Sequence, residues 1–366
     1  MRLIFIFPYL TFEPRVSAYV ANMLKRGHEV YIIAYSQYRR GWVHLDGANW
    51  FFVDAISLSF RGMVWKFPYF LHLEKLISQI KPDIIHINNL PFLTTLQAAR
   101  TSKKMGVASI IHVHGVIGKW NKLMDLLQYA FLQLFAQRFF NDTKLVICLT
   151  QSDACEVQKF GCPKNKIRLI PNGVDVEVFK PAKETPDLLF WGGRFIQQKG
   201  LEYLIEALSI IKEKIPDVKL LLSGDGVLIS KMHHMVKLAG LQKNVKFLGC
   251  VTLESIPILV NSCSVYVLPS LKEGMPYALL EAMACGKPVV GSDIPGIKDI
   301  IVNNQNGILV PPKNPQAIAH AVLLLLKDEK LRLKIGENAR KTIFNDYQWN
   351  LIINKVEKVY SEALKI

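Results

Sequence analysis

Cysteine is scarce in this sequence, and its spacing excludes most cysteine chemistry. The 366 residues contain six cysteines, and no two have the C-x-x-C spacing of a zinc or redox motif. Cys148, Cys250 and Cys263 adjoin apolar runs, as reduced core thiols do. A disulfide framework is unusual in a chain of this length, so the cysteines favour a cytoplasmic protein.

Several motifs are also missing. No G-x-G-x-x-G opens the first half and no Walker A loop is present, so dehydrogenase and P-loop functions lack support. No D-x-D string stands where a metal-dependent transferase needs one, and we expect no metal and no cofactor. A membrane-spanning helix needs about 18–20 nearly unbroken apolar residues. The leucine-rich segment 118–140 is interrupted by charged and amide side chains, so we expect no such helix.

The chain does carry a large positive charge. The formal net charge is +15, with 22 Lys/Arg against 12 Asp/Glu up to residue 180 and 23 against 18 after it, which leaves +10 and +5. Such a surface suits an anionic membrane or a phosphorylated substrate, and it can equally serve solubility. Nucleic acid is not expected, because no recognition motif accompanies the charge. The basic, aromatic segment 58–70 and the apolar segment 118–140 fit a membrane surface or a flap over the core.

Short apolar runs alternate with amphipathic stretches along the whole chain. Such runs lie at 3–7, 29–35, 83–87, 109–114, 144–150, 167–171, 187–192, 218–224, 244–249, 264–269, 287–292 and 307–311. Helical patterns lie between many of them, for example at 17–27 and 201–214. Strands that are apolar throughout are typical of parallel sheets covered on both faces. The alternation therefore predicts α/β, doubly wound domains.

Two such series follow one another and predict two Rossmann-like domains. A single core stops growing near about 250–300 residues, so the chain length agrees with this division. The proline-containing segment 179–187 is the expected linker. We expect an N-terminal domain at 1–180 and a C-terminal domain at 181–348. The last helix, 349–366, is expected to cross back to the first domain.

The segment 271–293 predicts a buried helix with a carboxylate inside it. Pro276 suits the first helical position and Gly286 the C-terminal stop. The residues between them are apolar nearly all round, which is typical of a buried helix. Glu281 lies in its middle, and a buried carboxylate needs partners. Hydroxyls of a bound sugar or ribose would serve, as would a neighbouring loop.

The start of the same helix predicts an anion site. Met275 has no side chain that can cap a helix. The N–H groups of Tyr277 and Ala278 are therefore available for phosphate oxygens. Glu273 lies in the loop before the helix, where a carboxylate can hold sugar hydroxyls.

A second informative segment is WGGRFIQQKG at 191–200. Its glycine pair, Gly192 and Gly193, allows a ligand to approach the backbone closely. Arg194 and Lys199 bring two cations to one place. Fixed cations stabilise the negative charge that a diphosphate gains as it leaves.

The string E-G-M-P-Y-A-L-L-E-A-M-A-C-G-K-P-V-V resembles the E-x₇-E signature of retaining glycosyltransferases of family four. Their fold, GT-B, has two Rossmann-like domains that face each other across a cleft. Glu273 and Glu281 match the two carboxylates. The resemblance implies that Glu281 binds the donor ribose and Glu273 contacts the transferred sugar. It implies that the backbone amides after Glu273, from Gly274 and Met275 onward, bind the diphosphate.

Other segments extend the resemblance. Arg194 and Lys199 match the cations that bind the diphosphate in this family. Within SGDG, Gly224 and Gly226 match a strand-end turn beside the nucleotide. The segments PNGVDVEVF (171–179) and 292–310 match the domain junction and the region after the second glutamate.

The first half of the chain matches the family more sparsely. HVHG (112–115) fits a strand end that in this family presents a histidine to the sugar, and His114 is the favoured residue. His112 points to the same face by the two-residue period and is a weaker candidate on the acceptor side. The glycine pair that often follows the first strand is replaced here by PYLTFEPRVSAYV (8–20). Arg15 is the candidate phosphate contact in its place.

The resemblance implies a metal-independent, hexosyl-type glycosyltransferase that retains anomeric configuration. Its partners would be a nucleotide-sugar donor and a glycan or lipid-linked acceptor, in cell-surface polysaccharide or glycolipid synthesis. The protein would be cytoplasmic and peripheral on the inner face of the membrane, held through its basic N-terminal domain. Two alternatives remain: a sugar-nucleotide epimerase of the same fold, and a degenerate, non-catalytic sugar-nucleotide-binding protein.

Overall fold

The structure is a computed structural model. It describes residues 1–7, 14–35, 39–53, 55–60, 63–68, 70–90, 92–116 and 122–366, and for 14–17, 55–60, 63–68 and 122–124 only the course of the backbone. Within these ranges the chain forms two compact units, residues 1–171 with 350–366 (unit 1) and residues 172–349 (unit 2).

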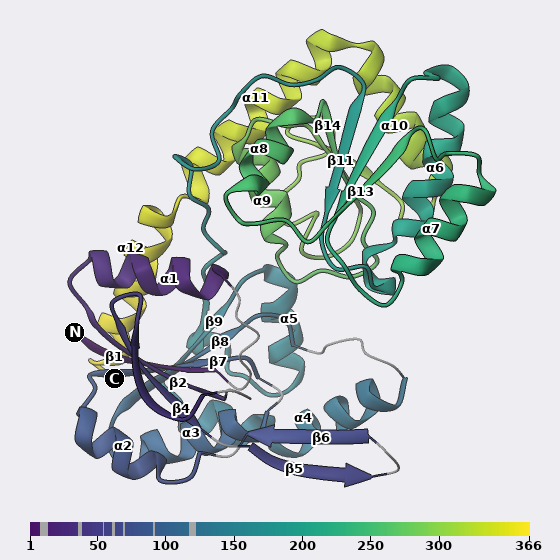
Figure 1. The fold of residues 1–366 in the computed structure, drawn as a ribbon. Coiled ribbons are helices and arrows are strands. Elements are labelled where there is room, and N and C mark those ends of the chain that lie inside the picture. Colours follow the sequence, from purple (N-terminus) through teal and green to yellow (C-terminus); the bar gives the residue numbers. More distant parts are fainter. Residues whose placement is uncertain are drawn as a thin grey trace. The chain divides into compact units, whose positions relative to one another are not determined.

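Unit 1 is built on a mostly parallel sheet (Figure 1). The strands lie in the order β10-β9-β8-β7-β1-β2-β4-β3, and among them β3–β4 is the antiparallel pair. Their bounds are β1 Arg2–Phe7, β2 Glu29–Tyr35, β3 Gly41–Leu45, β4 Ala48–Val53, β7 Ile84–Asn88, β8 Ala108–Val113, β9 Leu145–Cys148 and β10 Ile167–Leu169. All six strands predicted in the first half are present, within a few residues of their expected ends.

Two hairpins in unit 1 were not predicted. β3 and β4 are joined by Asp46 and Gly47, which both have positive φ, 52° and 79°. Asp-Gly between two strand-forming runs is a strong hairpin signal, and it was present in the sequence. A second hairpin pairs β5 (Ala55–Phe60) with β6 (Met63–Pro68), inside the segment 58–70 that was expected to be a flap or a membrane contact. The side chains of that hairpin lie outside the described residues.

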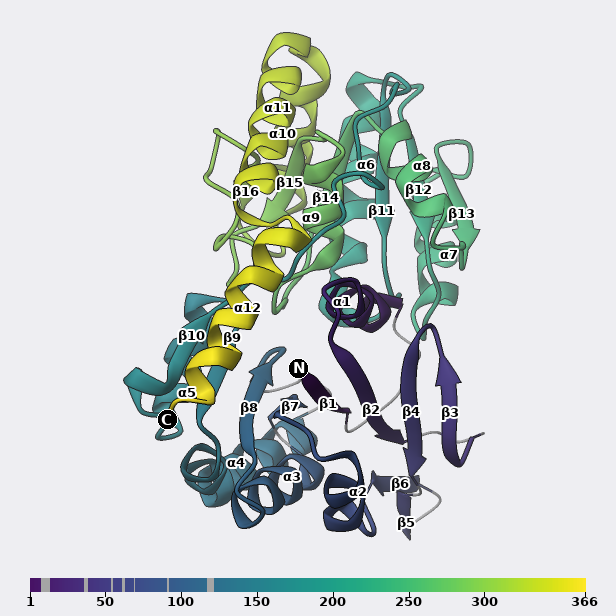
Figure 2. The ribbon, with the colours of Figure 1, turned by 90° about the vertical axis from the view of Figure 1, so that its left-hand side faces the viewer.

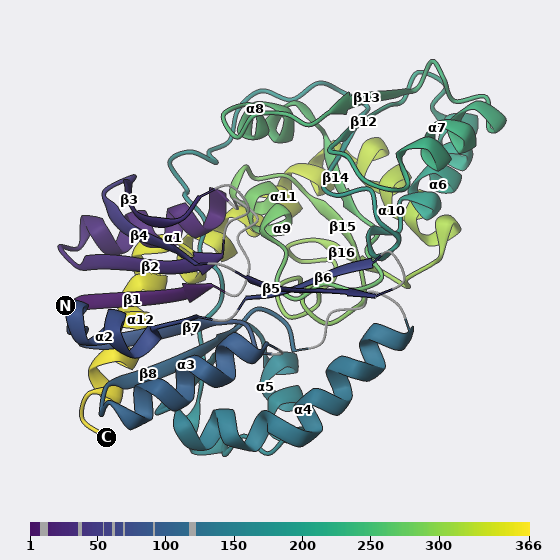
Figure 3. The ribbon, with the colours of Figure 1, turned by 60° about the horizontal axis from the view of Figure 1, so that its bottom comes forward.

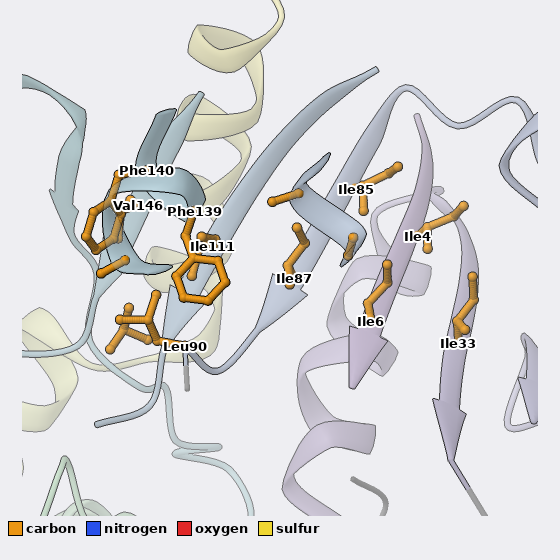
Figure 4. Close-up of a cluster of buried hydrophobic side chains, with 14 of the residues drawn as sticks. Ile4, Ile6, Ile33, Ile85, Ile87, Leu90, Ile111, Phe139, Phe140 and Val146 are labelled. Atoms are coloured by element: carbon orange, nitrogen blue, oxygen red, sulfur yellow. The ribbon is translucent and has the colours of Figure 1, made fainter. Parts of the chain in front are cut away.

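Helices cover both faces of the unit 1 sheet. They are α1 Pro14–Lys25, α2 Leu73–Ile80, α3 Leu93–Lys104, α4 Lys122–Asp142, α5 Gln151–Lys159 and α12 Trp349–Ala363. α2, α3 and α4 lie along one face, and α1 and α12 lie along the other (Figures 1 and 3). Ile4, Ile6, Ile85 and Ile87 point into the core beneath α2, α3 and α4, together with Phe139 of α4 (Figure 4).

The opposite face of the same strands is polar at several positions, because side chains alternate along a strand. His86 and Asn88 of β7, and His112 of β8 with His114 directly after it, all belong to this face. Tyr360 of α12 contacts the ring of His86, and Tyr19 of α1 packs against the rings of His86 and His112. Figure 2 shows α1 and α12 from another side.

The last helix belongs to unit 1, as the division of the chain shows. Glu357 of α12 pairs with Arg26 at 3.3 Å and with His28 at 2.8 Å. The Tyr360 hydroxyl lies 2.7 Å from Nδ1 of His86, and Glu362 pairs with Arg168. These polar contacts join the C-terminal helix to β7, β10 and the segment before β2.

Unit 2 has a six-stranded sheet that is parallel throughout, in the order β13-β12-β11-β14-β15-β16. Its strands are β11 Leu188–Gly192, β12 Lys219–Ser223, β13 Val245–Gly249, β14 Val265–Leu268, β15 Val289–Ser292 and β16 Ile308–Val310. All six lie where the sequence predicts strands. Its helices are α6 Leu201–Lys214, α7 Ile229–Leu238, α8 Ser255–Ser262, α9 Tyr277–Ala284, α10 Pro315–Lys327 and α11 Glu329–Asp346. α6, α7 and α10 pack on one face through a core around Trp191 and Leu222, and α8, α9 and α11 cover the other (Figure 1).

The division between the units falls earlier than the expected boundary at 180/181. Unit 2 begins at Asn172, so the segment 179–187 lies inside it. Hydrogen bonds give the physical reason. The Asn172 side-chain amide donates to the Met275 carbonyl at 3.0 Å, and the Val174 N–H donates to the Tyr347 carbonyl at 2.9 Å.

No helix in the described part of the chain is both long and apolar enough to cross a bilayer.

Candidate functional site

The predicted donor residues of unit 2 gather where several parallel strands end. Gly193 and Arg194 follow β11, the SGDG turn follows β12, and the loop 269–276 follows β14. Carboxyl ends of parallel strands meet at one edge of the sheet, where open α/β folds bind ligands. Each loop is fixed by backbone contacts to its neighbours.

The turns after β11 and β12 lie backbone against backbone. The Gly193 N–H donates to the Ser223 carbonyl at 2.9 Å, and the Phe195 N–H to the Asp225 carbonyl at 2.8 Å. A Cβ on Gly224 would lie 1.8 Å from the Gly193 oxygen. Gly224 has φ +124° and Gly226 has φ +153°, which side chains disfavour. Glycine is therefore required for both reasons, conformation and space.

An ion pair joins the two motifs that the sequence singled out. Nζ of Lys199 lies 2.7 Å from Oε1 of Glu273. The Ser270 hydroxyl donates to the same oxygen at 2.6 Å. The side chains of Lys199 and Glu273 are 20% and 9% exposed, so the pair is largely shielded from water.

Ser270 was not among the predicted residues. It is fully buried and lies two residues beyond β14. A polar residue directly after a buried strand is the signal that would have identified it. Its loop is held further by the Leu271 N–H, which donates to the Gln198 carbonyl at 2.7 Å. A Cβ on Gly296 would lie 1.9 Å from the Gly274 oxygen, so the loop after β15 also contacts this segment.

Helix α9 begins beside this ion pair without a side-chain cap. Pro276 is its N-cap and lies just before the first helical residue, Tyr277, and was expected to be the first residue itself. The N–H groups of Leu279 and Leu280 turn back to the Pro276 carbonyl. The Ala278 N–H forms no hydrogen bond to any residue that the structure describes. This helix start can therefore accept an anion.

The remaining donor candidates lie on or near α9. Glu281 is buried in the middle of the helix, as predicted. Gly286 has φ +69° and ends the helix as expected, with its N–H on the Met283 carbonyl. The Arg194 side chain is exposed and makes no hydrogen bond or ion pair with the described residues. Lys199 and Glu273 are thus in direct contact, whereas Arg194 stays open to solvent.

In unit 1 the histidine candidates form a row along the sheet. His112 is buried, and its Nδ1 lies 3.1 Å from Nε2 of His86, whose other nitrogen bonds Tyr360. His114 is exposed at the end of β8, with its ring centroid 4.2 Å from that of His112 and its Nε2 3.1 Å from Oδ1 of Asn88. His114 is therefore the accessible member of the row.

Loss of water around these rings determines their protonation. Desolvation lowers the pKa of His86 and of His112 well below the usual value for histidine. His114 keeps an exposed surface, but the groups packed around its ring remove part of its hydration and lower its pKa as well, so all three imidazoles are neutral at pH 7. Arg15 lies in the first turn of α1, and its side chain is outside the described residues. Those residues also contain no group of three or more His, Cys, Asp or Glu side chains arranged to hold a metal ion.

Two units built on parallel sheets, with polar side chains at the strand ends, are typical of two-domain α/β proteins that bind nucleotides. Comparison with known proteins agrees with this architecture. The family described as Glycosyl transferases group 1 matches residues 175–342, and Glycosyltransferase Family 4 matches residues 15–178. The chain belongs to these glycosyltransferases, family four in group 1.

Individual relatives span nearly the whole chain. An α-1,3-galactosyltransferase of Escherichia coli that acts on GlcNAc-diphosphoundecaprenol with UDP-Gal is 30% identical, over 87% of this chain and 85% of the relative. An uncharacterized glycosyltransferase of Methanocaldococcus jannaschii is 27% identical, over 94% of this chain and 92% of the relative. The structure of Anabaena HepE with UDP and glucose superposes with a TM-score of 0.77 at 18% identity, covering 99% of this chain and 100% of that one. The fold is therefore GT-B.

Proposed function

We propose that this protein transfers a hexosyl group from a nucleotide-diphosphate sugar to an acceptor hydroxyl with retention of anomeric configuration. The observation that carries the proposal is the Lys199–Glu273–Ser270 cluster beside the uncapped start of α9. A cation, a carboxylate and a helix N-terminus at one point suit a ligand that carries both phosphates and sugar hydroxyls.

Each group has a distinct role in the proposed reaction. Lys199, Arg194 and the amides at the start of α9 bind the diphosphate and stabilise its charge as the glycosidic bond breaks. We propose that these groups make a metal ion unnecessary. The donor phosphate takes the proton of the acceptor hydroxyl, so the attack comes from the face that the leaving group occupied. Glu273 binds hydroxyls of the transferred sugar and Glu281 binds the ribose.

The backbone of the surrounding loops completes the donor site. Gly224 and Gly226 let the turn after β12 pack against Gly193 and Phe195, where a Cβ would clash. We propose that Gly193, Gly224 and Gly226 line the nucleotide, because backbone without a Cβ allows a close approach. Gly274 and Met275 supply amides next to Glu273. On unit 1, His114 supports the reacting sugar, and Arg15 and His112 belong to the acceptor side.

Ligand-dependent thermal stabilisation tests the donor site. UDP-, GDP- and ADP-sugars are compared, because a ligand that binds the folded state raises the melting temperature by mass action. We expect one class to stabilise the protein and both Lys199→Ala and Glu281→Ala to abolish the effect. Lys237→Ala, which removes an exposed lysine of α7 in the same unit, is the matched control. Stabilisation that survives in both site variants would show that the donor binds elsewhere.

Product analysis tests the reaction itself. The anomeric coupling constant of the product, measured by proton NMR, distinguishes retention from inversion. An inverted product would contradict the proposed mechanism. Isomerised donor without acceptor would identify an epimerase, and tight binding without turnover would identify a degenerate transferase.

We further propose that the acceptor is a glycan or lipid-linked substrate, and that the protein is cytoplasmic and binds the inner face of the membrane. The relative from Escherichia coli is named for a diphosphoundecaprenol acceptor. Helix α4 exposes Leu126, Ala130 and Leu134, spaced four residues apart and so on one face. Leu126 is 63% exposed and Leu134 71%. The net charge of +15 favours anionic lipids.

Sedimentation with lipid vesicles tests membrane attachment. We expect binding to vesicles containing phosphatidylglycerol and little binding to neutral vesicles. Replacing Leu126 and Leu134 by serine should weaken binding, because their apolar area no longer leaves water. Leu238→Ser is the control, since Leu238 is equally exposed at 75% but lies on α7 of unit 2. Equal losses in both variants would exclude α4 as the contact.

A further inference from the structure

Asn88 lies between β1 and the accessible histidine, His114. It is the last residue of β7, and its side chain is buried, with 4% of its surface exposed. Its Nδ2 lies 3.3 Å from the Ile6 carbonyl oxygen of β1, and its Oδ1 lies 3.1 Å from Nε2 of His114. The Asn89 N–H donates to the His112 carbonyl at 2.9 Å, which holds the end of β7 against β8.

The Ile6 carbonyl determines which way the Asn88 amide faces. A carbonyl oxygen only accepts hydrogen bonds, so the NH₂ group must face it. The amide oxygen then faces His114, and it too only accepts. Nε2 of His114 must therefore carry a proton. In a neutral ring the proton is then absent from Nδ1, which keeps its lone pair.

The surroundings of His114 disfavour a second proton on its ring. Its neighbour is the buried, neutral His112, whose ring centroid is 4.2 Å away, and His86 lies one hydrogen bond further along the row. Tyr19 of α1 and Tyr360 of α12 face this row as well, and neither supplies a carboxylate. No residue that the structure describes bonds Nδ1 of His114. Among the described residues, its lone pair is therefore open to a ligand.

We propose that Asn88 is a positioning residue that holds His114 as the neutral Nε2–H tautomer, so that Nδ1 accepts a hydrogen bond from a hydroxyl of the transferred sugar. The coupling between Asn88 and His114 stands on the geometry of unit 1 alone. The identity of the bonded hydroxyl rests on the proposed transferase function. At this position the site selects a sugar group that donates a hydrogen bond.

Nitrogen NMR of the imidazoles tests the coupling directly. The full chain is labelled with ¹⁵N-histidine, and the signals of His114 among the nine histidines are identified by their loss in His114→Gln. We expect the wild-type ring at pH 7.5 to be neutral, with Nε2 protonated and Nδ1 bare. A protonated Nδ1 in the wild-type protein would overturn the proposal. This result does not depend on whether any variant of Asn88 folds.

Two variants test the role of the Asn88 oxygen. In Asn88→Asp a carboxylate faces Nε2, which should raise the pKa of His114 by roughly 1–3. Asn89→Asp adds the same charge one residue further along and is the matched control, with a clearly smaller shift. In Asn88→Leu the acceptor is lost, so both neutral tautomers of His114 should be populated. An unchanged tautomer in Asn88→Leu together with an unchanged pKa in Asn88→Asp would refute the proposal.

Rates of sugar transfer test whether His114 contacts the transferred sugar as proposed. Loss of orientation in Asn88→Leu should lower kcat/KM for transfer by up to about 100-fold. In Asn88→Asp the transfer rate should fall on the acidic side of the raised pKa of His114 and recover above it. Normal rates in both variants, with the NMR result as expected, would leave Asn88 as a purely structural residue. If the wild-type protein transferred no sugar, the NMR result would still decide the role of Asn88, so the two failures are distinguishable.

Discussion

Replacing Gly224 by alanine should separate the two turns that hold Arg194 in place. Gly224 has φ +124°, and an alanine there is strained by about 1–3 kcal/mol. Its Cβ would lie 1.8 Å from the Gly193 oxygen, a distance that real Cβ contacts do not reach, so one turn must move by more than an ångström. The hydrogen bonds from Gly193 to Ser223 and from Phe195 to Asp225 would be disturbed.

The expected loss of stability follows from these contributions. Each disturbed hydrogen bond costs about 0.5–1.5 kcal/mol, so with the backbone strain the total is about 2–6 kcal/mol. A domain has about 5–15 kcal/mol of stability, so unit 2 should still fold. A displacement of about 1 Å near reacting groups costs up to about 100-fold in rate. Activity should therefore suffer more than folding does.

Calorimetry with and without donor provides the assay, and Gly240→Ala is the control. Gly240 also has positive φ, +64°, but its Cβ would meet nothing within 4 Å. This variant should lose only about 1–2 kcal/mol and keep full donor binding. Gly224→Ala should show a lower melting temperature than the control and no stabilisation by the donor. Equal melting temperatures, or normal donor binding in Gly224→Ala, would refute the argument that these turns must touch.

Three further predictions concern other groups. Lys199→Met leaves Glu273 largely buried without its cation and should lower the free energy of unfolding by about 1–3 kcal/mol in urea titrations. Adding Glu273→Gln should recover part of the lost stability. No recovery would mean that Lys199 and Glu273 are not energetically coupled. In the native protein a thiol reagent should modify the exposed Cys155 and Cys250 only, because the other cysteines are buried and their pKa values are raised. Modification of a third thiol in the folded protein would contradict this expectation. Burial lowers the pKa of His86 and of His112, so the unfolded chain takes up protons at these residues before the folded chain does. The free energy of unfolding should therefore be at its full value above about pH 6.5 and fall below that pH by up to about 2.7 kcal/mol per pH unit. In a double variant, His86→Gln with His112→Gln, the slope on the acidic side should be shallower.

Local sequence patterns were sufficient for the alternation of strands and helices. The run at 29–35 and the helix at 201–214 have the predicted bounds, because continuous apolar runs and amphipathic periods are local properties. The hairpin of β3 and β4 was missed although Asp46 and Gly47 signalled its turn. The domain boundary was also misplaced, because proline content marked 179–187 whereas the contacts of Asn172 determine where unit 2 begins.

The residues of the candidate site also fall into those that the sequence predicts and those that it does not. Residue type and spacing predict Glu273, Glu281, Arg194 and Lys199 as donor-site residues, since each motif is contained in one short segment. Sequence patterns did not predict Ser270 or Asn88. Asn88 contacts His114 and Ile6, which are distant in sequence, and Ser270 belongs to no motif. The Ser270 hydroxyl matters through the Glu273 oxygen that it shares with Lys199, 74 residues away from Glu273.

The amino-acid order alone determined the class of the fold, and it predicts the two glutamates and the two cations of the candidate site, because these features are recorded in short, contiguous patterns. Tertiary structure alone decided that Lys199 reaches Glu273, that Gly224 touches Gly193, and that Asn88 faces His114. The physical reason is that hydrogen bonds and ion pairs depend on distances of a few ångströms. Those distances arise only when strands far apart in the chain are brought side by side in one sheet.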